Sequence, residues 1–285
     1  MKGKRYKLNI DRLEVCYTAP REVIDSLEDT TFWEREGYRL QESSRDRLET
    51  IFKVEILTPG KEQAWGVFAW LRIGNRFEKK EDTLRYCWIS LDNRALYTPG
   101  RDYGELPYLY WIEEDLGLSF NNISYLEIAL DSNVNWFRRV RAALRTEELT
   151  PVVLGKAYQN MKDRIKKLLY IHTGDRLRYR TDTLSLKSAN GEIALEIYNK
   201  GEEIEESEKY YIRECFGLAS GGLFRLEVKV RNRAFEDFCS SRGLTQYDIY
   251  NRLLDSGILF DIWLFYCNKL LRFKEKRTQV SLVQL

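Results

Sequence analysis

The sequence predicts an α+β fold with largely antiparallel sheet, flanking helices and a helical carboxy-terminal segment. Stretches in which polar and apolar residues alternate gather in two sets, 6–131 and 177–230, and such alternation is typical of half-buried strands. Amphipathic stretches with helical spacing lie between these sets and after the second. Strands and helices segregated in this way favour antiparallel pairing over the regular alternation of a parallel α/β fold.

The first 120 residues are expected to form an amino-terminal α+β region. Strands are predicted at 6–17, 46–57, 64–73, 83–90 and 95–97. Turn sequences such as Gly74-Asn75 and Asp92-Asn93 separate them. A short helix at 21–27 should follow Pro20, because proline suits the first turn of a helix.

The region 121–233 is expected to hold a second sheet with helices inserted. The predicted strands are 121–131, 177–179, 183–187, 193–199 and 224–230, and the predicted helices are 134–144 and 153–169. Ser132 and Asn133 would cap the first helix, and Asn190-Gly191 is a strong hairpin signal. The acidic run 201–208 is predicted to be a solvated loop. Amphipathic stretches at 235–241, 245–256 and 259–276 predict a helical segment over 234–285.

Composition and motifs exclude several classes of protein. Lysine and arginine total 46 against 44 acidic residues, so any nucleic-acid surface must come from an uneven distribution of charge. Five cysteines without a CxxC pair indicate reduced thiols and no zinc site. His172 is the only histidine and its plainer role is structural, so no site with two histidine ligands can form. No Walker A or GxGxxG sequence is present, which argues against an NTPase or a dinucleotide enzyme.

The sequence also bears on location. The amino terminus lacks an apolar signal core, and no run of about 18 apolar residues occurs. We therefore expect a cytoplasmic protein without a membrane span.

Two predicted strands in the central region present a tyrosine, carboxylates and cations on one face. Because alternate residues of a strand share a face, these sets are Glu196, Tyr198 and Lys200 on the first strand and Arg225, Glu227 and Lys229 on the second. Such a set suits a tyrosine that attacks a phosphate beside a bound metal ion, because phosphoryl transfer needs an aligned nucleophile and positive charge on the phosphate oxygens.

The predicted helix 134–144 and the residue after it carry a row of arginines at helical spacing, Arg138, Arg141 and Arg145, which we call the basic row. Its plain interpretation is a solvated helix face. Its alternative role is to track phosphates, because it directly follows the predicted strand that ends in Asp131.

The order of short motifs resembles the Rep_trans superfamily of replication initiators, which serve rolling-circle plasmids and some phages, together with related relaxases of mobile elements. The motifs are Leu126-Glu-Ile-Ala-Leu-Asp131, a helix, Leu184-Ser-Leu-Lys-Ser188, Ile197-Tyr-Asn-Lys200 and Phe224-Arg-Leu-Glu-Val-Lys229, within about 124–233. The resemblance implies a sequence-specific nick in a single strand at a replication or transfer origin. It also implies a tyrosine that stays joined to the 5′ phosphate, a divalent metal, and later rejoining of the strand.

Carried onto matching positions, the resemblance implies roles for six residues. Tyr198 is the nucleophile, and Lys200 and Arg225 stabilise the charge on the phosphate. Asp131 and Glu227 are metal ligands, with Glu127 as a third because it shares a strand face with Asp131. Oxygen ligands point to Mg²⁺ or Mn²⁺.

Each assignment has a plainer alternative. A tyrosine on a strand is usually a packing residue; Tyr210 and Tyr211, followed by Tyr247 and Tyr250, are the reserve nucleophiles. Glu227 between two cations would otherwise form only a cross-strand ion pair. Asp131 would otherwise cap the helix that follows it.

The resemblance implies single-stranded or hairpin DNA at an origin as the partner. A host helicase and a second copy of the chain, in a homodimer, are further partners to consider. The amino-terminal half would support and recognise DNA. Aromatic residues crowd this half, and although most should be core residues, one or two could stack on unpaired bases. They are Trp33, Tyr38, Trp65, Trp70, Trp88 and Trp111.

Two rival functions remain. One is a catalytically inactive DNA-binding or assembly protein of a mobile element, and the other is a metal-dependent nuclease that uses water in place of tyrosine.

Overall fold

The computed structural model of the chain describes residues 6–58, 64–74, 83–97, 106–160, 183–217 and 222–285. Within these ranges ten strands are hydrogen-bonded in the order β10-β11-β12-β7-β1-β6-β5-β4-β3-β2, and four more in the order β14-β13-β8-β9. The pairs of known register are antiparallel. The predicted α+β fold with largely antiparallel sheet is therefore confirmed.

The chain divides into two compact units. We call Ile10–Leu126 with Gln246–Tyr250 the Trp88 unit, and Met1–Asn9 with Glu127–Thr245 and Asn251–Leu285 the Tyr198 unit. Strands β1 and β7 contribute residues to both. No helix in the described part of the chain combines the length and the apolar character needed to cross a membrane.

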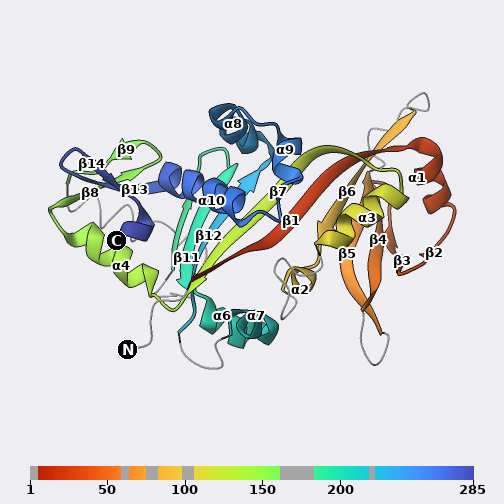
Figure 1. The fold of residues 1–285 in the computed structure, drawn as a ribbon, viewed down its shortest axis with the longest axis horizontal. Coiled ribbons are helices and arrows are strands. Elements are labelled where there is room, and N and C mark those ends of the chain that lie inside the picture. Colours follow the sequence, from red (N-terminus) through yellow and green to blue (C-terminus); the bar gives the residue numbers. More distant parts are fainter. Residues whose placement is uncertain (1–5, 59–63, 75–82, 98–105, 161–182, 218–221) are drawn as a thin grey trace. The chain divides into compact units, whose positions relative to one another are not determined.

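The Trp88 unit is mainly a curved antiparallel sheet (Figure 1). Its elements are β1 (Tyr6–Pro20), α1 (Arg21–Glu28), β2 (Phe32–Arg35), β3 (Tyr38–Arg45), β4 (Glu49–Thr58), β5 (Ala64–Gly74), β6 (Leu84–Leu91), α2 (Asn93–Leu96), α3 (Pro107–Asp115), the start of β7 (Ser119–Ser132) and α9 (Gln246–Tyr250). The predicted strand at 95–97 is wrong. Asp92 accepts a hydrogen bond from Arg94 N and caps the short helix α2 there.

Helix α9 joins the Trp88 unit through Tyr250. The Tyr250 ring stacks on Phe120 with a centroid distance of 4.7 Å, and its hydroxyl lies 2.9 Å from the Tyr17 hydroxyl. The same hydroxyl donates to Glu113 Oε2 at 2.7 Å. Burial raises the pKa of the Glu113 carboxyl, and the hydrogen bond from Tyr250 opposes that rise.

The Tyr198 unit combines a few strands of the large sheet with the small sheet and several helices (Figure 1). Its elements are the start of β1, the end of β7, α4 (Trp136–Arg145), β8 (Leu149–Val153), β9 (Lys156–Ala157), β10 (Leu184–Lys187), β11 (Ile193–Asn199), α6 (Lys200–Ser207), α7 (Tyr210–Phe216), β12 (Phe224–Arg231), α8 (Asn232–Arg242), α10 (Ser256–Leu270), β13 (Leu271–Glu275), β14 (Thr278–Val280) and a 3₁₀ turn (Leu282–Gln284).

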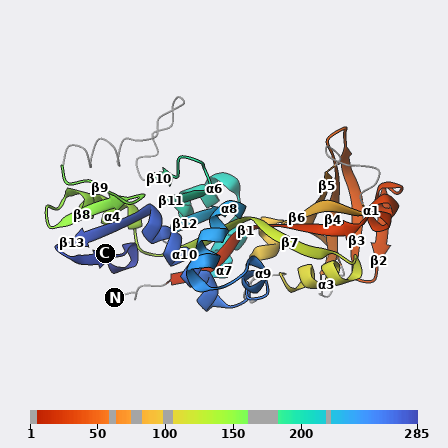
Figure 2. The same cartoon turned by 90° about the horizontal axis from the view of Figure 1, so that it is seen from above.

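The core of the Tyr198 unit lies between the sheet and two helices. Helices α4 and α10 pack against β11 and β12, and α4 also packs against β8 of the small sheet (Figure 2). Leu195, Ile197, Leu226 and Val228 are fully buried on this side. The Trp263 indole donates to Leu226 O at 3.2 Å, which satisfies a polar group inside an apolar layer.

The predicted helix at 153–169 is wrong in its first part. Val153 ends β8, and Leu154 and Gly155 both adopt positive φ in the turn that leads to β9. β8 pairs with β13, a partner more than 100 residues away, which local spacing does not reveal. The rest of this predicted helix, the predicted strand 177–179 and His172 lie outside the described residues.

Three other local predictions need correction. The acidic run 201–208 is not a loop, because all but its last residue lie in helix α6. Asn199 caps this helix by accepting a hydrogen bond from Gly201 N, and acidic residues suit a helix amino terminus. The helix predicted at 259–276 ends at Leu270, where the buried residues Leu271 and Phe273 begin the alternation of β13. Helix α9 covers only part of the predicted stretch 245–256.

Candidate active site

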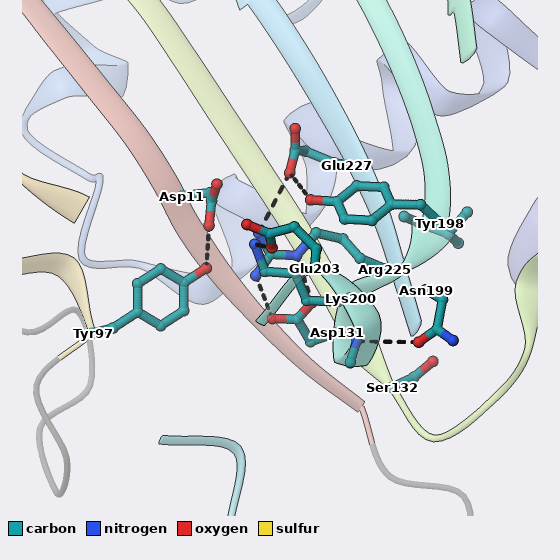
Figure 3. Close-up of polar contacts among 12 residues, drawn as sticks. Asp11, Tyr97, Asp131, Ser132, Tyr198, Asn199, Lys200, Glu203, Arg225 and Glu227 are labelled. Atoms are coloured by element: carbon teal, nitrogen blue, oxygen red, sulfur yellow. Dashed lines mark hydrogen bonds and ion pairs between the residues drawn. The ribbon is translucent and has the colours of Figure 1, made fainter. Parts of the chain in front are cut away.

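The register of β11 and β12 brings the predicted site together. Tyr198 pairs with Arg225, and Glu196 pairs with Glu227, so all four side chains share one face of the sheet. The apolar residues between them face the core. The alternation that predicted this face is therefore present in the structure. Figure 3 shows Tyr198, Arg225 and Glu227 close together.

Tyr198 and Glu227 form the contact at the centre of the site. The Tyr198 hydroxyl donates to Glu227 Oε2 at 2.9 Å. Glu227 is buried, whereas Tyr198 is only partly buried. A partly exposed phenol that donates to a buried carboxylate has a proton acceptor in place before any substrate arrives.

Arg225 is held in a fixed orientation by Asp131. Its Nε and Nη2 atoms donate to the two carboxylate oxygens of Asp131, both at 2.7 Å, and its Nη1 lies 3.4 Å from Glu227 Oε2. The Arg225 and Asp131 side chains are 0% and 1% exposed. This fork-to-fork geometry makes Asp131 the orienting partner of Arg225.

Asp131 and Ser132 do not cap the following helix. The cap of α4 is Asn135, whose side chain accepts from Arg138 N at 2.9 Å. The buried Ser132 hydroxyl instead accepts from the Trp136 indole at 2.7 Å and from Val134 N at 3.2 Å. The sequence-based cap was therefore placed a few residues too early.

Lys229 lies among three carboxylates. Its Nζ is 3.0 Å from Glu227 Oε1, 3.1 Å from Glu196 Oε2 and 3.6 Å from Glu127 Oε1. Burial lowers the pKa of the Lys229 ammonium, but the three neighbouring negative charges outweigh burial and raise this pKa above its usual range. Lys229 therefore carries a positive charge at the centre of an acidic cluster.

Lys200 is the first residue of α6 and not the last residue of the strand. Its Nζ forms an ion pair with Glu203 and lies 5.8 Å from the centre of the Tyr198 ring. The Lys200 side chain is buried, and its ammonium is a cation close to the phenol (Figure 3). Sequence reasoning missed Glu203; its spacing of three residues from Lys200 would have indicated it once the helix was known.

The donor set suits a hard divalent cation. Glu127 and Glu227 each offer a carboxylate oxygen, and these two atoms lie within 4.8 Å of each other. The ion pairs around Tyr198 join five acidic side chains to three basic ones. A divalent ion would therefore balance the charge of this cluster. The acidic set is Glu127, Asp131, Glu196, Glu203 and Glu227; the basic set is Lys200, Arg225 and Lys229. Oxygen ligands alone favour Mg²⁺ or Mn²⁺.

The remaining candidates are dispersed. The basic row (Arg138, Arg141 and Arg145) is exposed on α4. Tyr210 is exposed on α7, and the nearby Glu205 carboxylate raises its pKa. Tyr211 is partly buried on the same helix.

Two of the reserve tyrosines, Tyr247 and Tyr250, belong to the Trp88 unit. Burial raises the pKa of the Tyr250 phenol well above its usual range. A phenolate at Tyr250 is thereby disfavoured. In the same unit, Asp11 Oδ1 accepts from the Tyr97 hydroxyl at 2.7 Å (Figure 3).

No family model matches the chain, and no curated protein matches it. Among solved structures it is similar to a rolling circle replication initiator protein from Geobacillus stearothermophilus, at 11% identity and a TM-score of 0.45. That match covers 96% of this chain and 89% of the other.

Proposed function

We propose that this protein nicks and rejoins single-stranded DNA through a covalent bond between Tyr198 and a 5′ phosphate, at a replication or transfer origin. The hydrogen bond from the Tyr198 hydroxyl to the buried Glu227 carboxylate carries this proposal. In this contact Tyr198 is the nucleophile and Glu227 is the base. The cations Arg225 and Lys200 lie near them and stabilise negative charge.

The reaction is a transesterification, in which one phosphate ester bond forms as another breaks. The Tyr198 hydroxyl oxygen forms a bond to phosphorus while the bond between phosphorus and the 3′ oxygen breaks. The phenolic proton passes to Glu227, and the leaving 3′ oxygen takes up a proton from water. Reversal of the same steps rejoins the strand, because the phosphotyrosine bond keeps the ester linkage available.

Arg225 is the preorganised cation in this mechanism. Because both oxygens of Asp131 hold its guanidinium, Arg225 does not have to reorient as charge develops on the phosphate. Lys200 adds positive charge 5.8 Å from the centre of the Tyr198 ring, where it stabilises the negative charge that develops during attack on phosphorus.

The proposed metal ligands are Glu127 and Glu227. A bound Mg²⁺ or Mn²⁺ would supply Lewis-acid charge on the phosphate oxygens. We propose a different role for Asp131, as the positioning partner of Arg225, since both its oxygens already accept hydrogen bonds from that guanidinium. Lys229 would neutralise the carboxylates while the site holds no ion.

The proposed DNA contact outside the site is the basic row on α4. Its three arginines are exposed, and spacings of three and four residues place them along one side of the helix. Exposed arginines in such a row can neutralise successive phosphates of a single strand.

The direct test is a search for the covalent product. The full chain would be incubated with Mn²⁺ and a labelled pool of single-stranded oligonucleotides of random sequence, then run on a denaturing gel. We expect a protein–DNA adduct that disappears in Tyr198→Phe and in the presence of a chelator. Tyr210→Phe is the matched control, because it removes the hydroxyl of an exposed tyrosine in the same unit.

The other outcomes separate the alternatives. An adduct that survives in Tyr198→Phe would contradict the assigned nucleophile. Free cut ends made equally well by Tyr198→Phe would indicate the water-using nuclease, for which the Glu127 and Glu227 carboxylates would suffice. Binding of DNA without adduct or cut ends would indicate a catalytically inactive binding protein.

A further inference from the structure

A groove on one face of the sheet in the Trp88 unit is lined by two tryptophans and two arginines, among other residues. Its volume is about 390 Å³, and the residues that matter to the argument are Arg12, Glu14, Glu49, Trp70, Arg72 and Trp88. Strand register places these side chains together. Trp88 pairs with Arg72, Trp70 and Glu14 both pair with Ser90, and Glu49 pairs with Gly74. Directly paired residues share a face, so four strands contribute to one surface.

Trp88 lies over the strand next to its own. The Arg72 guanidinium is 5.2 Å from the centre of its ring. At Gly74 an added Cβ would be only 3.1 Å from Trp88 Cζ3, so the absence of a side chain there gives the indole its place. A glycine within a strand often marks a position where another group approaches closely.

Both groove tryptophans are only partly buried, unlike the tryptophans that serve the core. Trp136 and Trp263 are fully buried, and their indole N–H groups donate to Ser132 Oγ and Leu226 O. Trp70 and Trp88 are only partly buried, and they lie at positions that alternate with fully buried ones along β5 and β6.

The charges in the groove favour a neutral polar ring over a phosphate. Arg72 lies 3.6 Å from both Glu14 and Glu49, so its charge is already balanced. The two carboxylates repel anions but accept hydrogen bonds from the N–H groups of a base. Arg12 is exposed, and its guanidinium lies 4.8 Å from the centre of the Tyr125 ring. A cation at that position suits the phosphate that follows a stacked base.

We propose that this groove binds unpaired nucleobases of single-stranded DNA by stacking them on Trp70 and Trp88. The choice of ligand rests on the proposed function, because a protein that cuts a single strand has to hold unpaired bases. The site itself is separate from Tyr198 and uses no residue of the candidate active site. Stacking on aromatic rings is tolerant of sequence, since every base has a π face.

The test measures binding without chemistry. In a Tyr198→Phe background, the full chain would be titrated into labelled dT8, dA8 and an eight-base-pair duplex, with fluorescence anisotropy as the readout. We expect Trp88→Ala and Trp70→Ala each to weaken binding of both single strands by about 5- to 150-fold. Trp88→Phe, which keeps an aromatic face, should lose much less.

Trp33→Ala is the matched control. Trp33 is also partly buried in the Trp88 unit and also has an arginine over its ring, Arg35 at 4.4 Å, but it does not line the groove. We expect its binding curves to match those of the background protein.

A second measurement needs no change in the groove. Oligonucleotides that carry 5-iodouracil would be irradiated with the Tyr198→Phe protein, and the cross-linked peptides identified by mass spectrometry. Cross-links at Trp70 or Trp88 support the proposal, and cross-links confined to other residues overturn it.

The proposal also fails if the alanine variants bind like Trp33→Ala, or if the duplex binds as tightly as the single strands. These outcomes are independent of the adduct assay. A protein that forms an adduct through Tyr198 but binds bases elsewhere would refute only this inference. A protein that binds single strands through the groove but forms no adduct would refute only the proposed function.

Discussion

Replacing Asp131 by asparagine tests whether this residue orients Arg225 or binds a metal. The change removes one charge from a pair whose side chains are 0% and 1% exposed, and the Arg225 guanidinium also lies 3.4 Å from Glu227. Loss of one partner from a buried pair typically costs about 3–5 kcal/mol. For a chain of this size that loss lowers the melting temperature by roughly 6–20 °C.

The assay is thermal unfolding followed by near-ultraviolet circular dichroism, with Asp261→Asn as the matched control. Asp261 also forms a two-pronged pair with an arginine, Arg242, with both contacts at 2.9 Å, but these two side chains are 41% and 42% exposed. We expect the control to change the melting temperature little, because solvent screens exposed pairs.

Two further results would decide the matter. The double variant Asp131→Leu with Arg225→Met should recover much of the lost stability, since apolar replacement of a whole buried pair is often neutral or stabilising. If Asp131→Asn unfolds like the control but loses Mn²⁺ binding, the orienting role is refuted and Asp131 is a metal ligand.

Four other changes have definite expected outcomes. Lys229→Met should tighten Mn²⁺ binding by more than roughly tenfold in calorimetry, since unit charges about 4 Å apart interact by several kcal/mol at an effective dielectric of 20; unchanged affinity would place the ion elsewhere. Replacement of the whole basic row by glutamine should make the slope of log affinity for single strands against log salt about 2 units shallower, and an unaltered slope would remove the row from the DNA surface. Asn199→Ala should cost about 1 kcal/mol in urea unfolding through loss of the α6 cap, and no change would mean that the cap is dispensable. Burial raises the folded-state pKa of Glu113, so the stability contributed by the protonated carboxyl is full below the unfolded pKa and is lost as pH rises through the folded pKa. The melting temperature of Glu113→Gln should therefore rise relative to that of wild type between pH 4 and 7. A difference in melting temperature that does not change with pH would contradict this.

Local pattern was sufficient where a residue's surroundings are set by its own strand. The alternation around Tyr198 and Arg225 predicted which side chains share a face, because the period of a strand is fixed by its backbone. The hairpin at Asn190-Gly191 was predicted for a similar reason, and Gly191 does adopt positive φ.

Local pattern failed where a distant partner decides. Asp131 meets Arg225 across 94 positions of sequence, and no spacing rule connects them. Val153 became a strand residue because its partner is Leu271, although the stretch after it has helical spacing. The groove at Trp88 likewise depends on the register of four strands, of which the sequence predicts the existence but not the order.

The late return of α9 to the Trp88 unit has a consequence during protein synthesis. The ribosome must still make the 124 residues from Glu127 to Tyr250 after the first part of this unit has emerged. At about 5–20 residues per second this takes roughly 6–25 s. Throughout that interval Phe120 lacks its stacking partner, and Tyr17 and Glu113 lack the hydroxyl of Tyr250. A nascent chain stalled before this point therefore presents an incomplete core, and the unit is completed only once α9 has been made.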